Sequence, residues 1–404
     1  MTVTIEKGRA VGTVAAPPSK SMAHRLLICA ALSEGETVVH GIAESEDVRA
    51  TLDCLTALGA TAVLHGNSVT VRGVNPRKVT AKRELCCRES GSTLRFFIPI
   101  ALLGSGNTVL TGSETLLKRP MQVYEELCRT RGLFFSQDSR SVAVRGPLRG
   151  GEFTVAGNIS SQFISGLLFA LPLLPEDSVI HILPPVESRP YIDLTVSALA
   201  QFGVKVTWED ERTLAVAGNQ SYAAREVTVE GDYSGAAFFA ALNTLGGEVR
   251  IEGLFEDSLQ GDRVYARHLD SLSRGTPVIP IEDCPDLGPV LFAVAAAKNG
   301  GVFTGTRRLK IKESDRAETM AQELAKFGVS VKIHEDSVVV YPCDFHAPKE
   351  PLCGHNDHRV VMALAVLCTV TGGTIEGAQA VRKSFPDFFD KLKQLSIEVK
   401  TDET

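Results

Sequence analysis

The sequence lacks the features of a metalloprotein or a nucleotide-dependent enzyme. Its nine cysteines are an odd number, they are scattered, and no Cys-x-x-Cys pair or His/Cys cluster with zinc spacing occurs. No Gly-x-Gly-x-x-Gly follows a predicted strand, and there is no Walker loop. We therefore expect free thiols, no bound metal and no cofactor.

Segments that would target the chain to a membrane are also missing. Residues 1–6 lack a basic region and an apolar core, so we expect no signal peptide. No apolar run reaches the ~18 residues that a membrane span requires. With free thiols, these features predict a cytoplasmic protein that has no membrane partner.

Long basic stretches are absent as well. The 404 residues include 42 Lys and Arg against 48 Asp and Glu, a net charge of −6, and no basic stripe with interleaved aromatic residues occurs. These features argue against a nucleic-acid partner. The basic residues lie in short motifs, which suits a small anionic ligand in a cleft. With 44% hydrophobic residues, the chain has enough apolar residues for two folded domains.

The most informative stretch that is present covers residues 17–25. Two prolines forbid helix before it, and Ser19 is a natural N-cap for the apolar run that follows. Lys20 adds a positive charge, and a spacing of four places Ser21 and Arg25 on one helical face. A phosphate or carboxylate would bind well at this terminus. The alternative is a capped surface helix with solvated cations.

One pattern recurs along the chain: an amphipathic helix, a tight break, and two short strands joined by a polar turn. Six copies can be recognised, at residues 51–71, 122–144, 194–216, 265–279, 318–340 and 387–399. The breaks are about 70 residues apart, with one interval nearer 50, which indicates a repeated supersecondary unit.

A second set of helices alternates with the first and is almost wholly apolar, which predicts that these helices are buried. They cover residues 26–32, 94–103, 163–174, 236–242, 287–297 and 360–367. A polar cluster precedes each of them. If three repeats surround buried parallel helices in each domain, the helix N-termini share one end and create an anion-attracting cleft.

The boundary between the domains is expected after the strand at 226–230. We therefore expect an N-terminal domain at 19–229 and a C-terminal domain formed by 1–18 and 230–404, because the strand at 2–6 could return to the C-terminal half. The active site is expected in the interdomain cleft.

Two carboxylates lie among the cationic motifs. Cations beside Asp286 and Glu313 would keep both ionised at neutral pH and able to act as bases. Asp286 could instead be an ordinary N-cap, and Glu313 could stabilise a helix dipole. His358 could be a proton shuttle or could support Arg359 at the start of a helix. No serine has a His-Asp pattern that would make it a nucleophile.

Nine ordered motifs resemble those of the 5-enolpyruvylshikimate-3-phosphate (EPSP) synthase family over nearly the whole chain. They are Pro-Ser-Lys-Ser-Met-Ala-His-Arg at 18–25, Glu-Ser-Gly-Ser-Thr-Leu-Arg at 89–95, Lys-Arg-Pro at 118–120, Gly-Asn-Ile-Ser-Ser-Gln-Phe at 157–163, Ser-Arg-Pro-Tyr-Ile-Asp at 188–193, Pro-Asp at 285–286, Lys-Glu-Ser-Asp-Arg at 312–316, Asn-Asp-His-Arg at 356–359 and Lys-Ser-Phe-Pro-Asp at 383–387.

This resemblance implies an α/β (α+β) fold, a two-domain inside-out α/β barrel in which each domain has three βαβαββ repeats with buried parallel helices. It also implies transfer of the enolpyruvyl group of phosphoenolpyruvate to the 5-hydroxyl of shikimate 3-phosphate, with release of phosphate through a tetrahedral intermediate. The pathway would be chorismate and aromatic amino-acid biosynthesis. We expect a monomer whose partners are these two substrates.

The resemblance also implies the residues of the site. Those expected to hold shikimate 3-phosphate are Lys20, Ser21, Arg25, Ser160, Ser161, Gln162, Ser188, Tyr191, Asp286 and Lys312. Those expected to contact phosphoenolpyruvate are Lys20, Gly91, Arg119, Gln162, Arg316, Arg359 and Lys383. Asp286 would take the hydroxyl proton. Glu313 and Lys20 would handle the protons of the methylene and of the leaving group.

The chain departs from the family pattern at three positions. Glu89 replaces a common Asn, Phe96 follows the motif where Pro is frequent, and Arg308 lies where a substrate-contacting Asn can occur. Gly91, whose enlargement hinders glyphosate in this family, is retained, and we therefore expect sensitivity to glyphosate.

Two rival interpretations remain. The sister transferase that acts on UDP-N-acetylglucosamine often carries a reactive Cys before its Arg-Pro motif, and residues 111–118 contain none. A non-catalytic anion-binding protein would need no carboxylates beside its anions, so Lys20, Asp286 and Glu313 together argue against it.

Overall fold

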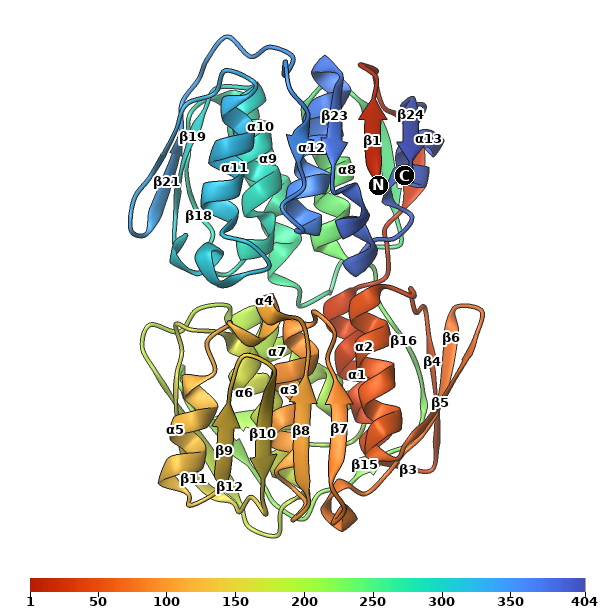
Figure 1. Cartoon of the computed structure of the whole chain (residues 1–404), viewed down its shortest axis with the longest axis vertical. Coiled ribbons are helices and arrows are strands. Elements are labelled where there is room, and N and C mark those ends of the chain that lie inside the picture. Colours follow the sequence, from red (N-terminus) through yellow and green to blue (C-terminus); the bar gives the residue numbers. More distant parts are fainter. Residues whose placement is uncertain (404) are drawn as a thin grey trace. The chain divides into compact units, whose positions relative to one another are not determined.

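The computed structural model describes residues 1–403 and divides into two compact units (Figure 1). One unit is Pro18–Glu230. The other combines Met1–Pro17 with the residues from Gly231 onward. The chain therefore leaves the second unit after its first strands, builds the whole of the first unit, and then returns.

In the unit Pro18–Glu230, three four-stranded sheets surround three buried helices. The buried helices are α1 (Lys20–Leu32), α3 (Gly91–Ala101) and α6 (Ser161–Ala170). The outer helices are α2 (Glu46–Leu58), α4 (Glu114–Leu117), α5 (Gln122–Thr130) and α7 (Arg189–Gln201). Helix α3 packs along α6, and α1 packs against α2 and α7. The predicted burial of the apolar helices is confirmed.

The three sheets of this unit share one strand order, a parallel pair followed by two antiparallel strands. The first is β16 (Glu226–Thr228), β4 (Glu36–His40), β6 (Ser68–Arg72) and β5 (Thr61–His65). The second is β7 (Arg83–Cys86), β8 (Asn107–Thr111), β10 (Ser141–Arg145) and β9 (Phe134–Gln137). The third is β11 (Gly151–Ala156), β12 (Ser178–Leu183), β14 (Thr213–Val216) and β13 (Val206–Trp208). A short parallel pair joins β3 (Ser33–Glu34) to β15 (Tyr222–Ala223).

The local sequence explains how each repeat turns. Helix α2 is amphipathic and ends at Gly59, whose φ of 109° is the left-handed conformation that glycine adopts readily. In strand β6 burial alternates: Val69 and Val71 are fully buried, Ser68 and Thr70 are half-buried, and Arg72 is exposed. One face of the hairpin therefore covers the buried helices, and the other faces outward.

The other unit repeats this plan around the buried helices α8 (Tyr233–Thr244), α10 (Gly288–Ala297) and α12 (His358–Thr371). Its outer helices are α9 (Tyr265–Arg274), α11 (Arg316–Ala325) and α13 (Phe388–Gln394). One sheet is β18 (Val278–Pro280), β19 (Gly301–Thr304), β21 (Ser337–Val340) and β20 (Val331–Ile333). The other is β22 (Leu352–Cys353), β23 (Gly373–Glu376), β1 (Thr2–Ile5) and β24 (Val399–Asp402). Strand β1 thus pairs with strands from the far end of the sequence (Figure 1).

The prediction of two strands after every amphipathic helix was wrong for two copies. At residues 387–399, only β24 follows α13 in the described part of the chain, and β24 pairs with β1 from the start of the chain. The other copy is the one at residues 265–279. Only the parallel pair of β2 (Val11–Ala15) and β17 (Glu248–Glu252) forms there, without the two antiparallel strands of the other sheets. Three residues separate α9 from β18, which is too short a segment for a hairpin. This missing hairpin accounts for the short interval in the repeat.

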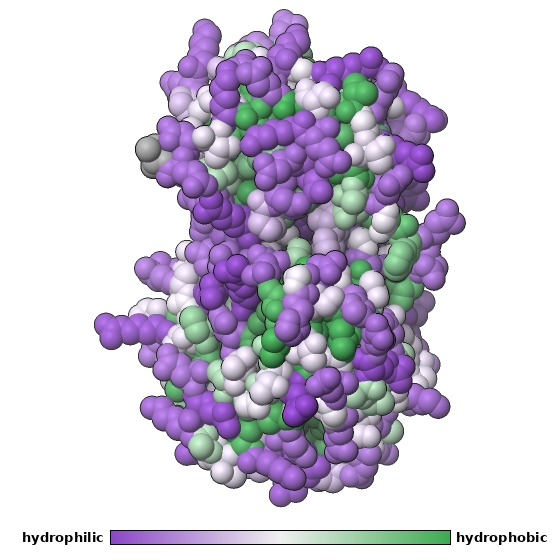
Figure 2. Space-filling view, turned by 90° about the vertical axis from the view of Figure 1, so that its right-hand side faces the viewer, coloured by the Kyte–Doolittle hydropathy of each residue, from purple (hydrophilic) through white to green (hydrophobic). Residues whose placement is uncertain are grey.

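Each unit has its own hydrophobic core. In the unit that contains both ends of the chain, Phe239 lies 5.7 Å from Phe385 and 6.0 Å from Phe388, measured between ring centroids. Hydrophilic side chains cover most of the face in Figure 2, with apolar ones scattered among them. In the part of the chain described, no helix combines the length and the apolar character needed to cross a bilayer.

Candidate active site

The start of α1 places Lys20 beside a carboxylate that sequence reasoning missed. Ser19 caps the helix as predicted, because its hydroxyl accepts a hydrogen bond from the Met22 amide at 3.3 Å. Nζ of Lys20 lies 2.7 Å from Oδ2 of Asp47, in the first turn of α2. The two side chains are only 15% and 10% exposed. The sequence signal for Asp47 was the capped acidic start Ser45-Glu46-Asp47, whose ordinary function is to stabilise a helix N-terminus.

Arg25 uses its guanidinium to connect α1 to α7. Its Nε donates to Oγ1 of Thr195 at 2.8 Å, and its Nη2 donates to the carbonyl of Tyr191 at 2.9 Å. A third bond runs from Nη1 to the carbonyl of Ser21. Burial lowers the pKa of Arg25 to about 10, which leaves it cationic at neutral pH. In this structure Arg25 therefore holds the first turn of α7 through the backbone carbonyl of Tyr191, and its direct contact with substrate stays a prediction.

A second group gathers where α3 and α6 begin. A Cβ atom built on Gly91 would lie 2.6 Å from Nη1 of Arg119, so this guanidinium packs directly on the glycine. Gln162 donates to Oγ of Ser92 at 2.9 Å and accepts from Nη1 of Arg95 at 2.7 Å. Gly91, Arg119 and Gln162, all expected at the phosphoenolpyruvate site, thus lie close together, and Arg95 is a further member of the group.

The serines predicted in this unit lie at helix starts. Ser160 caps α6 through the Gln162 amide at 3.3 Å, and Ser161 is the first residue of that helix. Ser188 precedes α7 with a φ of 56°, a conformation that few residues other than glycine adopt. Tyr191 is half-buried in the first turn of α7. Such strained positions are typical of ligand-binding segments.

In the other unit, the side chain of Arg316 is 1% exposed and bonds to three carboxylates. Its Nε donates to Oδ2 of Asp357 at 2.9 Å, its Nη1 to Oδ1 of Asp286 at 2.7 Å, and its Nη2 to Oε2 of Glu313 at 2.8 Å. Burial alone would lower the pKa of Arg316, but these carboxylates raise it well above its usual value. Arg316 therefore holds the two predicted acid-base groups in fixed positions.

Asp286 lies among cations. Nζ of Lys312 is 3.3 Å from its Oδ1, and Nη2 of Arg359 is 3.7 Å from its Oδ2. Burial would raise the pKa of Asp286, but Lys312, Arg316 and Arg359 together hold it well below the usual range. The residue lies in a 3₁₀ turn (η4, Pro285–Leu287), and α10 has no side-chain cap. The alternative interpretation of Asp286 as an ordinary N-cap is therefore wrong.

Glu313 is not the first-turn acid that its structural alternative required. Helix α11 begins at Arg316, and Asp315 caps it. Glu313 lies before the cap, with its side chain 17% exposed. It shares with Asp286 the guanidinium of Arg316 rather than the first turn of a helix.

The start of α12 supplies the remaining groups. Asp357 is fully buried and caps the helix by accepting from the Arg359 amide at 2.9 Å. Nη2 of Arg359 is 3.9 Å from Oδ2 of Asp232, and Nζ of Lys383 donates to the carbonyl of Asn356 at 2.6 Å. Asp232 and Asp357 belong to the polar clusters that precede the apolar helices, and nothing in the sequence indicated which cations they would meet.

Two other residues singled out in the sequence are buried. His358 is 2% exposed, with Nδ1 3.9 Å from Oδ1 of Asp357. Arg308, one of the departures from the family pattern, is 5% exposed and donates to the carbonyl of Glu282. Neither contact tests the roles expected of these residues.

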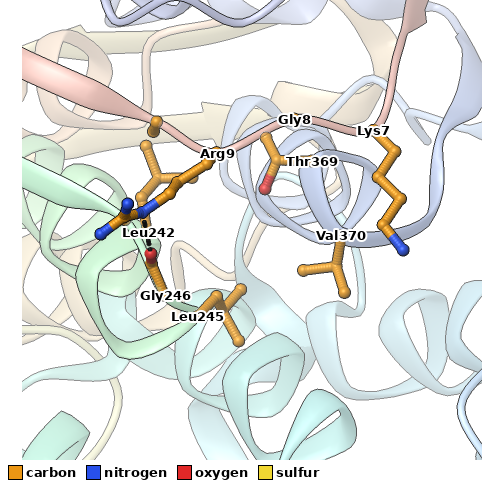
Figure 3. Close-up of a pocket in the computed structure, with 10 residues that line it drawn as sticks. Lys7, Gly8, Arg9, Leu242, Leu245, Gly246, Thr369 and Val370 are labelled. Atoms are coloured by element: carbon orange, nitrogen blue, oxygen red, sulfur yellow. Dashed lines mark hydrogen bonds between the residues drawn. The ribbon is translucent and has the colours of Figure 1, made fainter.

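A pocket of about 510 Å³ lies elsewhere in the same unit (Figure 3). It lies near the C-terminal ends of α8 and α12, with Leu245 and Val370 in its lining. Arg9 at its edge donates to the carbonyl of Gly246 at 2.9 Å (Figure 3). None of the predicted site residues lines this pocket. Across residues 1–403, no group of three or more His, Cys, Asp or Glu side chains is placed to hold a metal ion.

Comparison with known proteins gives a consistent result along the whole chain. The sequence profile described as EPSP synthase (3-phosphoshikimate 1-carboxyvinyltransferase) matches residues 5–392. The chain is 38% identical over 424 residues to 3-phosphoshikimate 1-carboxyvinyltransferase of Clostridium kluyveri, an alignment that covers 98% of each chain. It is 39% identical over 422 residues to the protein of that name from Clostridium perfringens SM101, again over 98% of each.

Solved structures share the fold. EPSP synthase from Acinetobacter baumannii aligns with a TM-score of 0.79 and 23% identity, over 100% of both chains. The enolpyruvyl transferase NikO from Streptomyces tendae aligns with a TM-score of 0.76 and 14% identity, over 99% of this chain and 98% of that one. The predicted α/β fold class is confirmed.

Proposed function

The chain belongs to the EPSP synthase family, and we propose that it performs the family's reaction with two sets of residues, one in each unit. Its activity is that of a 3-phosphoshikimate 1-carboxyvinyltransferase, which moves the enolpyruvyl group of phosphoenolpyruvate to shikimate 3-phosphate in aromatic biosynthesis. The specific proposal concerns which side chains bind each substrate and which of them move protons.

Shikimate 3-phosphate is bound mainly by helix starts in the unit Pro18–Glu230. The proposed residues there are Lys20, Ser21, Arg25, Ser160, Ser161, Gln162, Ser188 and Tyr191, with Asp286 and Lys312 from the other unit. Support comes from the capped first turns of α1 and α6, where amides and hydroxyls favour a phosphate. The bonds of Arg25 to Thr195 and to the backbone carbonyl of Tyr191 hold the start of α7 beside α1.

Phosphoenolpyruvate is bound by cations from both units. The proposed residues are Lys20, Gly91, Arg119, Gln162, Arg316, Arg359 and Lys383. Gly91 leaves room for the guanidinium of Arg119, and Gln162 is held by Arg95 and Ser92. Planar guanidinium groups suit the bidentate recognition of carboxylate and phosphate.

The observation that carries the proposed chemistry is the low pKa of Asp286, which keeps it ionised at neutral pH. In the addition step, the 5-hydroxyl oxygen bonds to the enol carbon of phosphoenolpyruvate while Asp286 accepts the hydroxyl proton. Glu313 first takes up a proton from water and then donates it to the methylene carbon, which completes the tetrahedral intermediate. Such proton transfers each contribute about 10²–10⁴ in rate.

In the elimination step the carbon–oxygen bond to phosphate breaks and a proton leaves the methyl group, which regenerates the enol ether. Glu313 takes this proton back, and Lys20 donates one to the departing phosphate. Arg119, Arg316 and Lys383 offset the charge that develops on the phosphate. We propose that the protein works as a monomer and without a cofactor.

The test is phosphate release from phosphoenolpyruvate by purified protein, with shikimate 3-phosphate or UDP-N-acetylglucosamine as the acceptor. We expect release only with shikimate 3-phosphate, and release with UDP-N-acetylglucosamine alone would favour the sister transferase. Asp286→Asn and Glu313→Gln are expected to lose turnover while still binding shikimate 3-phosphate in calorimetry. If both variants retain wild-type turnover, the proposed acid-base roles are wrong.

A further inference from the structure

Asp262 is a buried carboxylate that neither the fold nor the proposed chemistry explains. It lies in the 3₁₀ turn η3 (Gly261–Val264), which packs against α8 and α9, and it is 1% exposed. Its Oδ2 accepts a hydrogen bond from the hydroxyl of Ser234. Its Oδ1 has no hydrogen-bond partner among residues 1–403, although nearly all buried polar atoms in folded proteins have one.

The surroundings of Asp262 connect it to the proposed site. Ser234, which bonds to Asp262, lies two residues after Asp232 at the start of α8, and Oδ2 of Asp232 is 3.9 Å from Nη2 of Arg359. Asp286, Asp232 and Arg359 all interact with Asp262 electrostatically. Arg359 is itself 3% exposed, and its Nε bonds to no described atom. The titratable and charged groups of the segments around Asp262 include Asp232 and Tyr233 at the start of α8, Arg263 on η3, and Tyr265, Arg267, His268, Asp270 and Arg274 on α9. Around η4 they include Glu282, Asp283, Cys284 and Asp286, and α12 contributes Arg359.

Opposing influences act on the pKa of Asp262. Burial, followed by the charges of Asp286 and Asp232, raises the pKa of Asp262 to about 7, while Ser234 and Arg359 oppose the rise. The charge of Asp262 therefore changes near neutral pH, whereas Asp286 stays ionised. A change in the field of Arg359 would alter how often Asp262 is protonated.

We propose that Asp262 is a positioning residue that takes up a proton from the buffer when an anionic substrate group binds to Arg359. This inference rests on the proposed role of Arg359 in binding phosphoenolpyruvate. An anion on Arg359 cancels the positive field that favours the Asp262 carboxylate. The carboxylate then becomes a carboxylic acid, and the buried region near Arg359 avoids an added negative charge. The same coupling makes a proton on Asp262 favour substrate binding, because linkage is reciprocal.

The experiment compares the KM for phosphoenolpyruvate of wild type and Asp262→Asn between pH 6 and pH 8, at saturating shikimate 3-phosphate. Asn is neutral at every pH and has the size of the protonated acid. If the anion raises the pKa of Asp262 by one unit, the wild-type KM rises roughly five-fold more than that of the variant over this range. Titration of the substrate itself affects both KM values equally, so it cancels in the ratio of the wild-type KM to the variant KM. The ratio of their kcat values is expected to stay constant with pH.

Ser234→Ala is a second variant that does not alter the carboxylate. It removes the hydrogen bond that favours the ionised form, so the rise in KM is expected to move to higher pH. Asp257→Asn is the matched control, because Asp257 is an exposed acid five residues away in the same segment. It is expected to follow the wild-type profile.

The outcomes separate the two proposals. Arg359→Gln is expected to raise the KM for phosphoenolpyruvate at every pH. If it does so but the profiles of Asp262→Asn and Ser234→Ala both match wild type, the role of Asp262 is refuted and that of Arg359 stands. If Arg359→Gln leaves the KM unchanged, the premise fails and the role of Asp262 fails with it.

Discussion

The replacement Gly91→Ala tests whether the contact between this position and Arg119 positions the guanidinium. The added Cβ would stand 2.6 Å from Nη1 of Arg119. An ordinary contact between heavy atoms is roughly 3.5 Å, so the guanidinium must move by about 0.9 Å. The nearest atom of Arg95 would be 3.8 Å away, an ordinary contact that requires no shift.

We expect this movement to weaken the binding of phosphoenolpyruvate without destabilising the fold. The atom that must move is the end of a flexible side chain, and alanine suits the first turn of α3 at least as well as glycine. We therefore expect the free energy of unfolding to change by less than about 1 kcal/mol. Since a misplacement of about 1 Å can cost ~10²-fold in a positioned site, the KM for phosphoenolpyruvate should rise roughly 10- to 100-fold.

The assay is steady-state kinetics for both substrates together with urea unfolding. Gly275→Ala is the control, because a Cβ at Gly275 meets no atom within 4 Å. Its KM values should equal those of wild type. If Gly91→Ala folds normally and keeps the wild-type KM for phosphoenolpyruvate, the contact with Arg119 does not position the substrate and the reasoning is refuted.

Three further predictions follow from the buried charges and from Gly91. Asp357→Asn removes the fully buried carboxylate among the three that contact Arg316, and urea unfolding should show a loss of about 3–5 kcal/mol; wild-type stability would contradict this. Asp262→Asn should be as stable as wild type at pH 4 and more stable at pH 8. The reason is that a folded-state pKa near 7 makes the wild-type protein lose stability as the pH rises from about 4 to 7. A difference in unfolding free energy between variant and wild type that does not change with pH would contradict this prediction. Glyphosate should inhibit turnover because Gly91 is retained, and normal turnover at millimolar glyphosate would contradict this expectation.

Local patterns were enough to predict much of the fold. The apolar helices and the cap at Ser19 depend on neighbouring residues, so the sequence contains the information needed to recognise them. The missing hairpin after α9 was not recognised, because the short spacing at 265–279 was assigned to a full repeat. Spacing alone indicates that a repeat exists, but not which of its strands form.

The site was harder to predict than the fold. Asp357 contacts Arg316 from 41 residues away, and Asp47 contacts Lys20 from 27 residues away. Both acids occupy helix-cap or first-turn positions, where stabilising the helix is a sufficient explanation. Asp262 lies in a segment, η3, that matches no motif. Its burial depends on the packing of η3 against α8, which no local pattern specifies.

The charges around Arg316 are better explained by function than by stability. Its side chain is 1% exposed, and Asp357 is fully buried. Removing each ion from water costs several kcal/mol. A protein in which well-packed apolar residues replace such a buried ion group is often as stable as the original or more stable. An ion cluster at this cost is useful where carboxylates must stay ionised and fixed before the substrate arrives. Since Arg316 bonds both Asp286 and Glu313, one guanidinium sets the position of both proposed proton-transfer groups. The variant Arg316→Lys keeps the charge but not this geometry. It should therefore raise the activation free energy of turnover, measured from kcat, by more than it lowers the free energy of unfolding.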